Sequence, residues 1–224
     1  MVTISIIFEG GMLPEISGKD EPRKAIRTDD FQASNNTLRL IEAFNKLFSS
    51  GLTNKTIKIN CISGGPDKQA AKEFKNSSLS PFLLVDMEGK QETKPQRLSD
   101  IGLQEHPNQE KIFFMIQKME AWILSQPDKI EACFSLYRKP NKAFPIEEDE
   151  SIKGKKPGNI VHPDRLLQAI LKRNFEIKRR DRVRDLEYGK LKNAPDLIAS
   201  LDIQRLRNAF EDVDKLLNAI NTEG

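Results

Sequence analysis

Four short apolar runs, separated by stretches with helical spacing, constrain most strongly how this chain of 224 residues can fold. The runs are rich in aromatic and branched side chains and cover residues 2–8, 56–62, 82–85 and 111–117. Runs of this length with few polar residues are typical of strands buried on both faces, as in parallel sheets. We therefore predict an α/β fold in which a parallel sheet is flanked by helices.

The helical stretches indicate how the chain divides. Residues 36–50 carry apolar side chains at helical spacing, and further helix starts follow the second and fourth runs. A polar segment at 12–34 follows the first run, and we predict an insertion there. The domain prediction is a core over 1–137, a charged linker over 138–157 and a helical C-terminal portion over 158–224.

The last helical stretch carries an apolar stripe with spacings of four, three, four and three residues. Its members are Leu206, Phe210, Val213, Leu217 and Ile220. Such a stripe is either a seam that faces the core or a surface for a partner or a second copy. The sequence therefore leaves open whether the chain forms an oligomer.

Composition excludes several classes of protein. With 38% hydrophobic residues the chain can bury a core, and a net charge of +3 argues against a uniformly cationic coat. We find neither a signal peptide nor an apolar run near the ~20 residues of a membrane span, so we expect a cytoplasmic protein without membrane contact. Cys61, Cys133 and the two histidines lack the spacing of zinc ligands.

Acidic residues follow three of the four predicted strands. Glu9 follows the first run, Asp86 and Glu88 follow the third, and Glu120 begins the helix after the fourth. The carboxyl ends of parallel strands meet at one edge of a sheet, and alternation along an extended chain would point Asp86 and Glu88 the same way. Clustered carboxylates suit Mg²⁺ or Mn²⁺, which also binds phosphate and water.

Each of these features also has a plain structural explanation. A single acid after a strand is commonly a turn or helix cap, and the helix dipole favours Glu120 in a first turn. Gly64 and Gly65 precede a helix and form either a phosphate-binding turn or a tight strand-to-helix connection.

Positive charge is concentrated in residues 165–192, which hold ten Lys or Arg against four Asp or Glu. This is either a strip that contacts nucleic acid or a solvated helix face with alternating ion pairs. We favour nucleic acid slightly, because the excess is local while the chain as a whole is nearly balanced. The candidate residues are Lys172, Arg173, Arg179, Arg180, Arg182, Arg184 and Lys190.

The ordered motifs resemble a known family. FEGG, SGGPDKQAAKEF, LLVDMEG, FFMIQKMEAWIL and YGKLKNAPDLIASLD occur in the order found in the Toprim-like bacterial domain-of-unknown-function family 4276. The Toprim fold is shared by topoisomerases, primases and nucleases of the OLD type. One departure is Pro66, where family members tend to carry a basic residue.

The resemblance implies a metal-dependent nuclease, with Glu9, Asp86, Glu88 and Glu120 as catalytic residues and the first three as ligands of Mg²⁺ or Mn²⁺. It also implies an effector subunit of an anti-phage defence complex with an ABC- or AAA-type ATPase. The chain has no phosphate-binding G-x-x-x-x-G-K-[ST] loop, so the ATPase would be a partner. The alternative is a non-catalytic scaffold that binds this ATPase through its C-terminal helices. Two features favour it: the second acid of the motif after the third strand is Glu88 where an Asp could stand, and the segment 12–34 is unusual.

Overall fold

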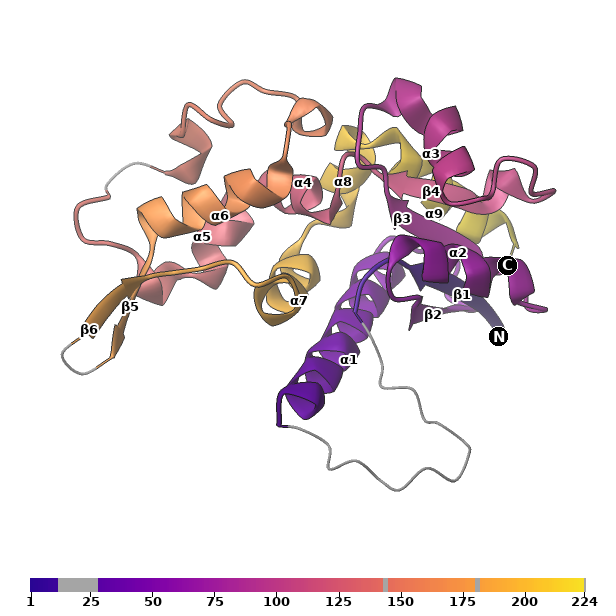
Figure 1. Cartoon of the computed structure of the whole chain (residues 1–224), viewed down its shortest axis with the longest axis horizontal. Coiled ribbons are helices and arrows are strands. Elements are labelled where there is room, and N and C mark those ends of the chain that lie inside the picture. The colour runs from indigo at the N-terminus through magenta and orange to yellow at the C-terminus, as the bar shows by residue number, and fades with distance from the viewer. Residues whose placement is uncertain (12–27, 143–144, 180–181, 224) are drawn as a thin grey trace.

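The computed structural model describes residues 1–11, 28–142, 145–179 and 182–223 (Figure 1). Four strands form one sheet: β1 (Val2–Phe8), β2 (Ile57–Ser63), β3 (Phe82–Asp86) and β4 (Ile112–Met115). Their order is β2-β1-β3-β4, and every neighbouring pair is parallel. The predicted α/β fold is confirmed, and β1 and β3 occupy the centre of the sheet.

Nine α-helices flank or follow the sheet in the part of the chain that the structure describes. They are α1 (Thr28–Ser49), α2 (Asp67–Asn76), α3 (Lys94–Asp100), α4 (Met119–Leu124), α5 (Pro127–Cys133), α6 (Pro163–Asn174), α7 (Lys190–Ser200), α8 (Ile203–Ala209) and α9 (Glu211–Glu223). Because α1 begins at Thr28, it reaches into the predicted insertion at 12–34. The remainder of that insertion, 12–27, lies outside the described residues.

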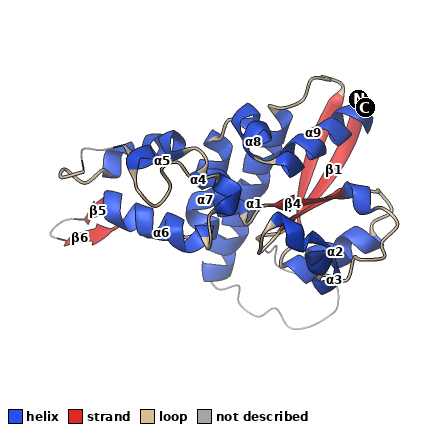
Figure 2. Cartoon of the chain, turned by 90° about the horizontal axis from the view of Figure 1, so that it is seen from above, coloured by secondary structure: helices blue, strands red, loops and turns tan. Residues whose placement is uncertain are grey.

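Helices cover both faces of the sheet because the side chains of β1 alternate. Phe8 packs against Phe44 of α1, with the ring centroids 4.5 Å apart. Ile7 faces the other way, where Gly64 lets Ala70 of α2 approach closely; a Cβ at Gly64 would lie 2.6 Å from that of Ala70. Figure 2 shows α2 and α3 on one side of the sheet and α9 on the other.

An aromatic cluster joins the sheet layer to the C-terminal helices. The fully buried ring of Trp122 in α4 lies 6.5 Å from Phe44, 6.4 Å from Phe48 and 6.2 Å from Phe210. Aromatic pairs at these separations add packing energy beyond the burial of their area. The cluster thus connects α1, α4 and the junction between α8 and α9.

The C-terminal portion shares its core with the sheet. Helix α7 packs along α1, and α9 packs against β4. All five residues of the predicted apolar stripe are buried, so the stripe faces the core. Ile146 and Ile152, from the segment predicted as a linker, belong to the same core cluster.

A two-stranded antiparallel hairpin interrupts the helical C-terminal portion. It consists of β5 (Glu176–Arg179) and β6 (Arg182–Asp185) and lies at the opposite end of the molecule from the sheet (Figures 1 and 2). The sequence predicts only helix here, because each of these strands holds a single apolar residue, Ile177 or Val183, among charged ones. Among the described helices, none is both long and apolar enough to cross a bilayer.

Two leucines of α1 provide a test of this packing. Leu40 is fully buried, whereas Leu38 is 48% exposed. We expect Leu40→Ala to lower the free energy of unfolding by about 2–5 kcal/mol through lost burial and a cavity. Leu38→Ala should change it by no more than about 0.5 kcal/mol. Urea unfolding measures both, and equal effects would contradict the packing of α1.

Candidate active site

Glu9 and Asp86 meet at the carboxyl edge of the sheet, as the sequence predicts. Phe8 is in register with Leu84 across β1 and β3, and the Glu9 N–H donates to the Leu84 carbonyl at 2.9 Å. The Asp86 N–H in turn donates to Oε2 of Glu9 at 2.9 Å. The two acids are therefore fixed relative to each other by the register of the central strands.

Asp86 is only 2% exposed, and its side chain is held by two donors. The N–H of Met119, the first residue of α4, donates to Oδ1 at 2.9 Å. The Lys190 Nζ, at the start of α7, lies 3.1 Å from Oδ2. A buried carboxylate needs such partners, because leaving it unpaired costs several kcal/mol.

Glu120 of α4 lines one pocket with Lys190. It is buried, and the Tyr188 hydroxyl donates to its Oε1 at 3.0 Å. Its Oε2 is also buried but has no hydrogen-bond partner among the described residues. An unsatisfied buried oxygen costs about 1–3 kcal/mol, so it is a position where a ligand or water would gain a strong contact.

The pKa values of this cluster reflect burial and mutual charge. Burial, followed by the negative charge of Asp86, raises the pKa of Glu9 to about 7. Burial also raises the pKa of Glu120. For Lys190, burial opposes the charged form, but Asp86, Glu120 and Glu9 outweigh it and raise its pKa. At neutral pH, Glu9 is thus poised to exchange a proton while Lys190 remains charged.

Glu88 lies apart from this group. Strand β3 ends at Asp86, and Glu88 has a left-handed backbone with φ of 56°, so strand alternation does not govern its direction. Its side chain is 52% exposed and lies 3.9 Å from Arg97. Asp86 and Glu88 therefore do not share the direction that the sequence suggested.

Arg97 of α3 braces the loop after β3 from the other side. Its Nε donates to the Asp86 carbonyl at 3.0 Å, and its guanidinium pairs with Asp67 of α2 at 2.8 Å. A further nitrogen lies 3.7 Å from Glu9 and, within the described structure, has no hydrogen-bond acceptor. This residue is a positioning group that the sequence analysis missed.

The predicted phosphate turn is occupied by structural contacts. The N–H of Gly64 donates to the Phe8 carbonyl at 2.9 Å, and the Gly65 carbonyl accepts from Gly10 at 2.9 Å. Gly65 also needs its positive φ of 72°. These glycines join β2 closely to α2, and the Gly64 N–H is not free for a phosphate.

Those of the predicted basic residues that the structure describes do not all lie in one place. Lys190 enters the acidic cluster, Lys172 pairs with Glu187 at 3.1 Å, and Arg173 pairs with Asp149 at 2.7 Å. Arg182 and Arg184 are exposed on β6. Arg180 lies outside the described residues, as does the side chain of Arg179.

A pocket of about 360 Å³ opens beside the acidic cluster. Glu120, Tyr188 and Lys190 form its inner wall, and α6 supplies Asp164, Arg165 and Gln168. The Gln168 side chain accepts from the Tyr188 N–H at 2.8 Å, which fixes the segment before α7 against α6. This pocket gives a ligand access to Glu120 and Lys190.

Sequence analysis identified Glu9, Asp86 and Glu120 but missed what joins them. Lys190 is 104 residues from Asp86, and the sequence analysis placed it only among the contacts to nucleic acid. The motif YGKLKN, which holds both Tyr188 and Lys190, was the available signal. For Arg97, the short helix α3 gave none.

The acids lie close to one another but do not form a ready metal cage. Within the described residues, no group of three or more His, Cys, Asp or Glu side chains is placed to hold a metal ion. The ammonium of Lys190 is the cation that Asp86 contacts. Mg²⁺ commonly takes only one or two carboxylates, so Glu9 and Asp86 alone supply as many acids as this ion uses.

The fold and this site define an α/β protein with an acidic centre at the edge of a parallel sheet. Residues 42–221 match the family described as Domain of unknown function (DUF4276), and the chain belongs to that family. No curated protein and no solved structure matches it.

The raised pKa of Glu9 gives a prediction on stability. Between its ordinary pKa of 4.5 and about 7, the folded protein binds the extra proton, so stability falls as pH rises through this window. Glu9→Gln keeps the acceptor for the Asp86 N–H and removes the buried charge. With EDTA present, we expect it to stabilise the protein at about pH 8 by on the order of 1–3 kcal/mol.

This gain should fade as the pH approaches about 5, since the wild-type carboxyl is then protonated too. Chemical unfolding at both pH values measures it, and Glu73→Gln on the exposed face of α2 controls for the lost charge. A gain of equal size at both pH values would contradict the raised pKa of Glu9.

Proposed function

We propose that this protein is a metal-dependent nuclease that hydrolyses phosphodiester bonds at the cluster of Glu9, Asp86 and Glu120. The observation that carries the proposal is the grouping of these carboxylates around Asp86: Lys190 pairs with Asp86 at 3.1 Å, Glu9 accepts from the Asp86 N–H, and Glu120 lines one pocket with Lys190. Oε2 of Glu120 has no hydrogen-bond partner among the described residues, so this oxygen is available to a water or an ion. The Toprim resemblance supports the same chemistry.

Glu9 and Asp86 are the residues that would hold Mg²⁺ or Mn²⁺, since their oxygens are hard ligands at the open edge of the sheet. When bound, the ion would supply Lewis acidity and neutralise charge on the phosphodiester. Glu88 is half-exposed beside Arg97 and would serve as an outer ligand.

The remaining residues have roles that follow from their surroundings. In the metal-free protein the pKa of Glu9 is raised to about 7, and we propose this carboxyl as either a ligand of the ion or the base that takes a proton from the attacking water. Lys190 remains charged and lies at the wall of the pocket, where it would attract a phosphate oxygen. Tyr188 orients Glu120 through its hydroxyl.

The second candidate is a non-catalytic scaffold, and one observation favours it. Lys190 already neutralises Asp86, and the described residues offer no group of three metal ligands. In that case the pair Asp86–Lys190 would lock the C-terminal helices to the sheet. In either role, the family resemblance suggests an ATPase partner and a place in anti-phage defence.

Cleavage assays separate the two candidates. We expect wild-type protein to cut labelled single-stranded DNA, duplex DNA or tRNA with Mg²⁺ or Mn²⁺, and not with EDTA. Asp86→Asn and Glu9→Gln should lower the rate by at least about 10²-fold, the usual effect of removing a group that acts in the reaction. Glu73→Gln, exposed on α2, should leave the rate unchanged.

Each variant is first shown to be folded by circular dichroism, and each assay is repeated with any ATPase encoded beside it. Undiminished cutting by Asp86→Asn would refute the site. The absence of cutting in every mixture, with folded protein that binds the ATPase, would establish the scaffold instead.

A further inference from the structure

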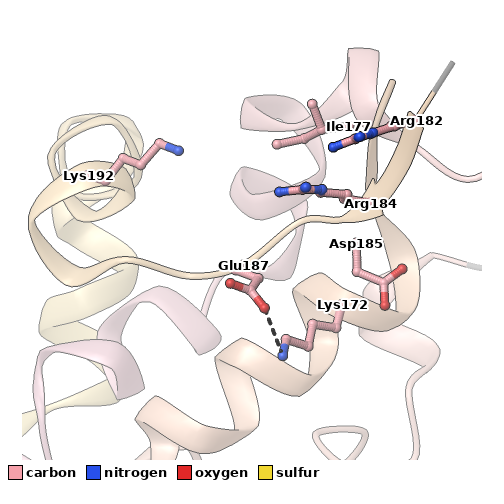
Figure 3. Close-up of a pocket in the computed structure, with 7 residues that line it drawn as sticks. All are labelled: Lys172, Ile177, Arg182, Arg184, Asp185, Glu187 and Lys192. Carbon is pink, nitrogen blue, oxygen red and sulfur yellow. Dashed lines mark ion pairs between the residues drawn. The ribbon is translucent and has the colours of Figure 1, made fainter. Parts of the chain in front are cut away.

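A groove with a volume of about 710 Å³ lies next to the candidate active site. Its walls are β6, the end of α6 and the start of α7, which lie close together although they are separate in sequence (Figure 3). Four basic side chains line it: Lys172, Arg182, Arg184 and Lys192. Figure 3 shows Arg184 and Lys192 pointing toward each other from opposite walls.

The acids of the groove are already neutralised by other bases. Asp185 pairs with Lys139 at 2.7 Å, and Glu187 pairs with Lys172 at 3.1 Å. Arg182, Arg184 and Lys192 therefore have no carboxylate partner within the described part of the chain. Three cations that share a groove without counter-charges favour a polyanion with regularly spaced charges.

The lining also indicates which polyanion fits. Proteins that bind single-stranded nucleic acid stack its bases on aromatic side chains. No aromatic side chain of the described residues lines this groove, where the one apolar residue is Ile177. A two-stranded β-ribbon such as β5–β6 is, in contrast, of a size that the major groove of a duplex admits.

The groove and the active-site pocket adjoin along α6 and the segment before α7. Gln168 lines the pocket and Lys172 lines the groove, one helical turn or about 6 Å apart. Lys190 of the pocket and Lys192 of the groove are two residues apart in the first turn of α7. Since one strand carries a phosphate about every 3.4 Å of duplex axis, a backbone in the groove would reach the pocket within about two nucleotides.

We propose that Arg182, Arg184 and Lys192 form a binding site for the phosphate backbone of duplex nucleic acid, distinct from the acidic cluster. The hairpin β5–β6 anchors the duplex and sets which phosphodiester reaches Lys190 and Glu120. The role in positioning a substrate rests on the proposed function, whereas the binding itself does not.

Fluorescence anisotropy in EDTA tests the binding without any cleavage. The probes are duplex DNA and duplex RNA of about two helical turns and the corresponding single strands, in salt from about 50 to 200 mM. We compare wild type, R182A/R184A, K192A and K72A/K75A. The last variant also removes two positive charges, but from the exposed side of α2, and is therefore the matched control for R182A/R184A.

We expect the wild type to bind duplex more tightly than single strands. R182A/R184A should weaken duplex binding by roughly tenfold or more and reduce the slope of log K against log salt by about two, one for each lost phosphate contact. K192A should reduce the slope by about one. K72A/K75A should bind as the wild type does.

Equal losses in R182A/R184A and K72A/K75A would overturn the proposal, as would tighter binding of single strands or no binding of any nucleic acid. Comparing the two duplexes identifies DNA or RNA as the preferred source of the backbone. The outcomes are separable from those of the active site, because the anisotropy is measured in EDTA without cleavage and R182A/R184A removes no residue of the acidic cluster.

Discussion

The buried carboxylate of Asp86 is the interaction on which the arrangement of the site depends. Alone in the core this charge would be costly, and the structure supplies a backbone N–H from α4 and an ammonium from α7. The backbone N–H of the same residue holds Glu9. One residue at the end of β3 thereby connects β1, α4 and α7. The positions of the acids therefore depend on how the C-terminal helices pack.

This arrangement keeps two unfavourable features, a buried titratable carboxyl and a buried oxygen without a partner among the described residues, that a purely structural core would avoid. Glu9 is held with a pKa near 7, and an oxygen of Glu120 is buried without a partner in the described structure. Perturbed titratable groups beside a pocket are typical of functional sites, although ion-pair networks also produce them. The adjoining basic groove fits the same interpretation, because it continues the pocket along α6 toward the hairpin.

The strands, and with them the position of Glu9 and Asp86, could be predicted because short apolar runs fix both the sheet and its carboxyl edge. The shared direction of Asp86 and Glu88 could not, since the strand ends at Asp86, two residues before Glu88, and Glu88 has a left-handed backbone. The pair Asp86–Lys190 joins residues 104 positions apart, and the packing of α7 on α1 and α5 brings them together. The hairpin could not be predicted because its strands present exposed charged residues instead of an apolar face. Pairing between β5 and β6 holds them in place.

The most direct test of a cation site at Asp86 is a crystal structure of the protein grown with MnCl₂, using anomalous diffraction from manganese. We expect an anomalous peak from a manganese ion within bonding distance of the Asp86 and Glu9 carboxylates. Lys190 Nζ should have moved away from Asp86 Oδ2, which it contacts at 3.1 Å without the ion. The peak should be absent from Asp86→Asn crystals grown in the same way. A wild-type crystal with no peak at this edge, and with Asp86 and Lys190 still paired, would contradict a metal centre and favour the scaffold.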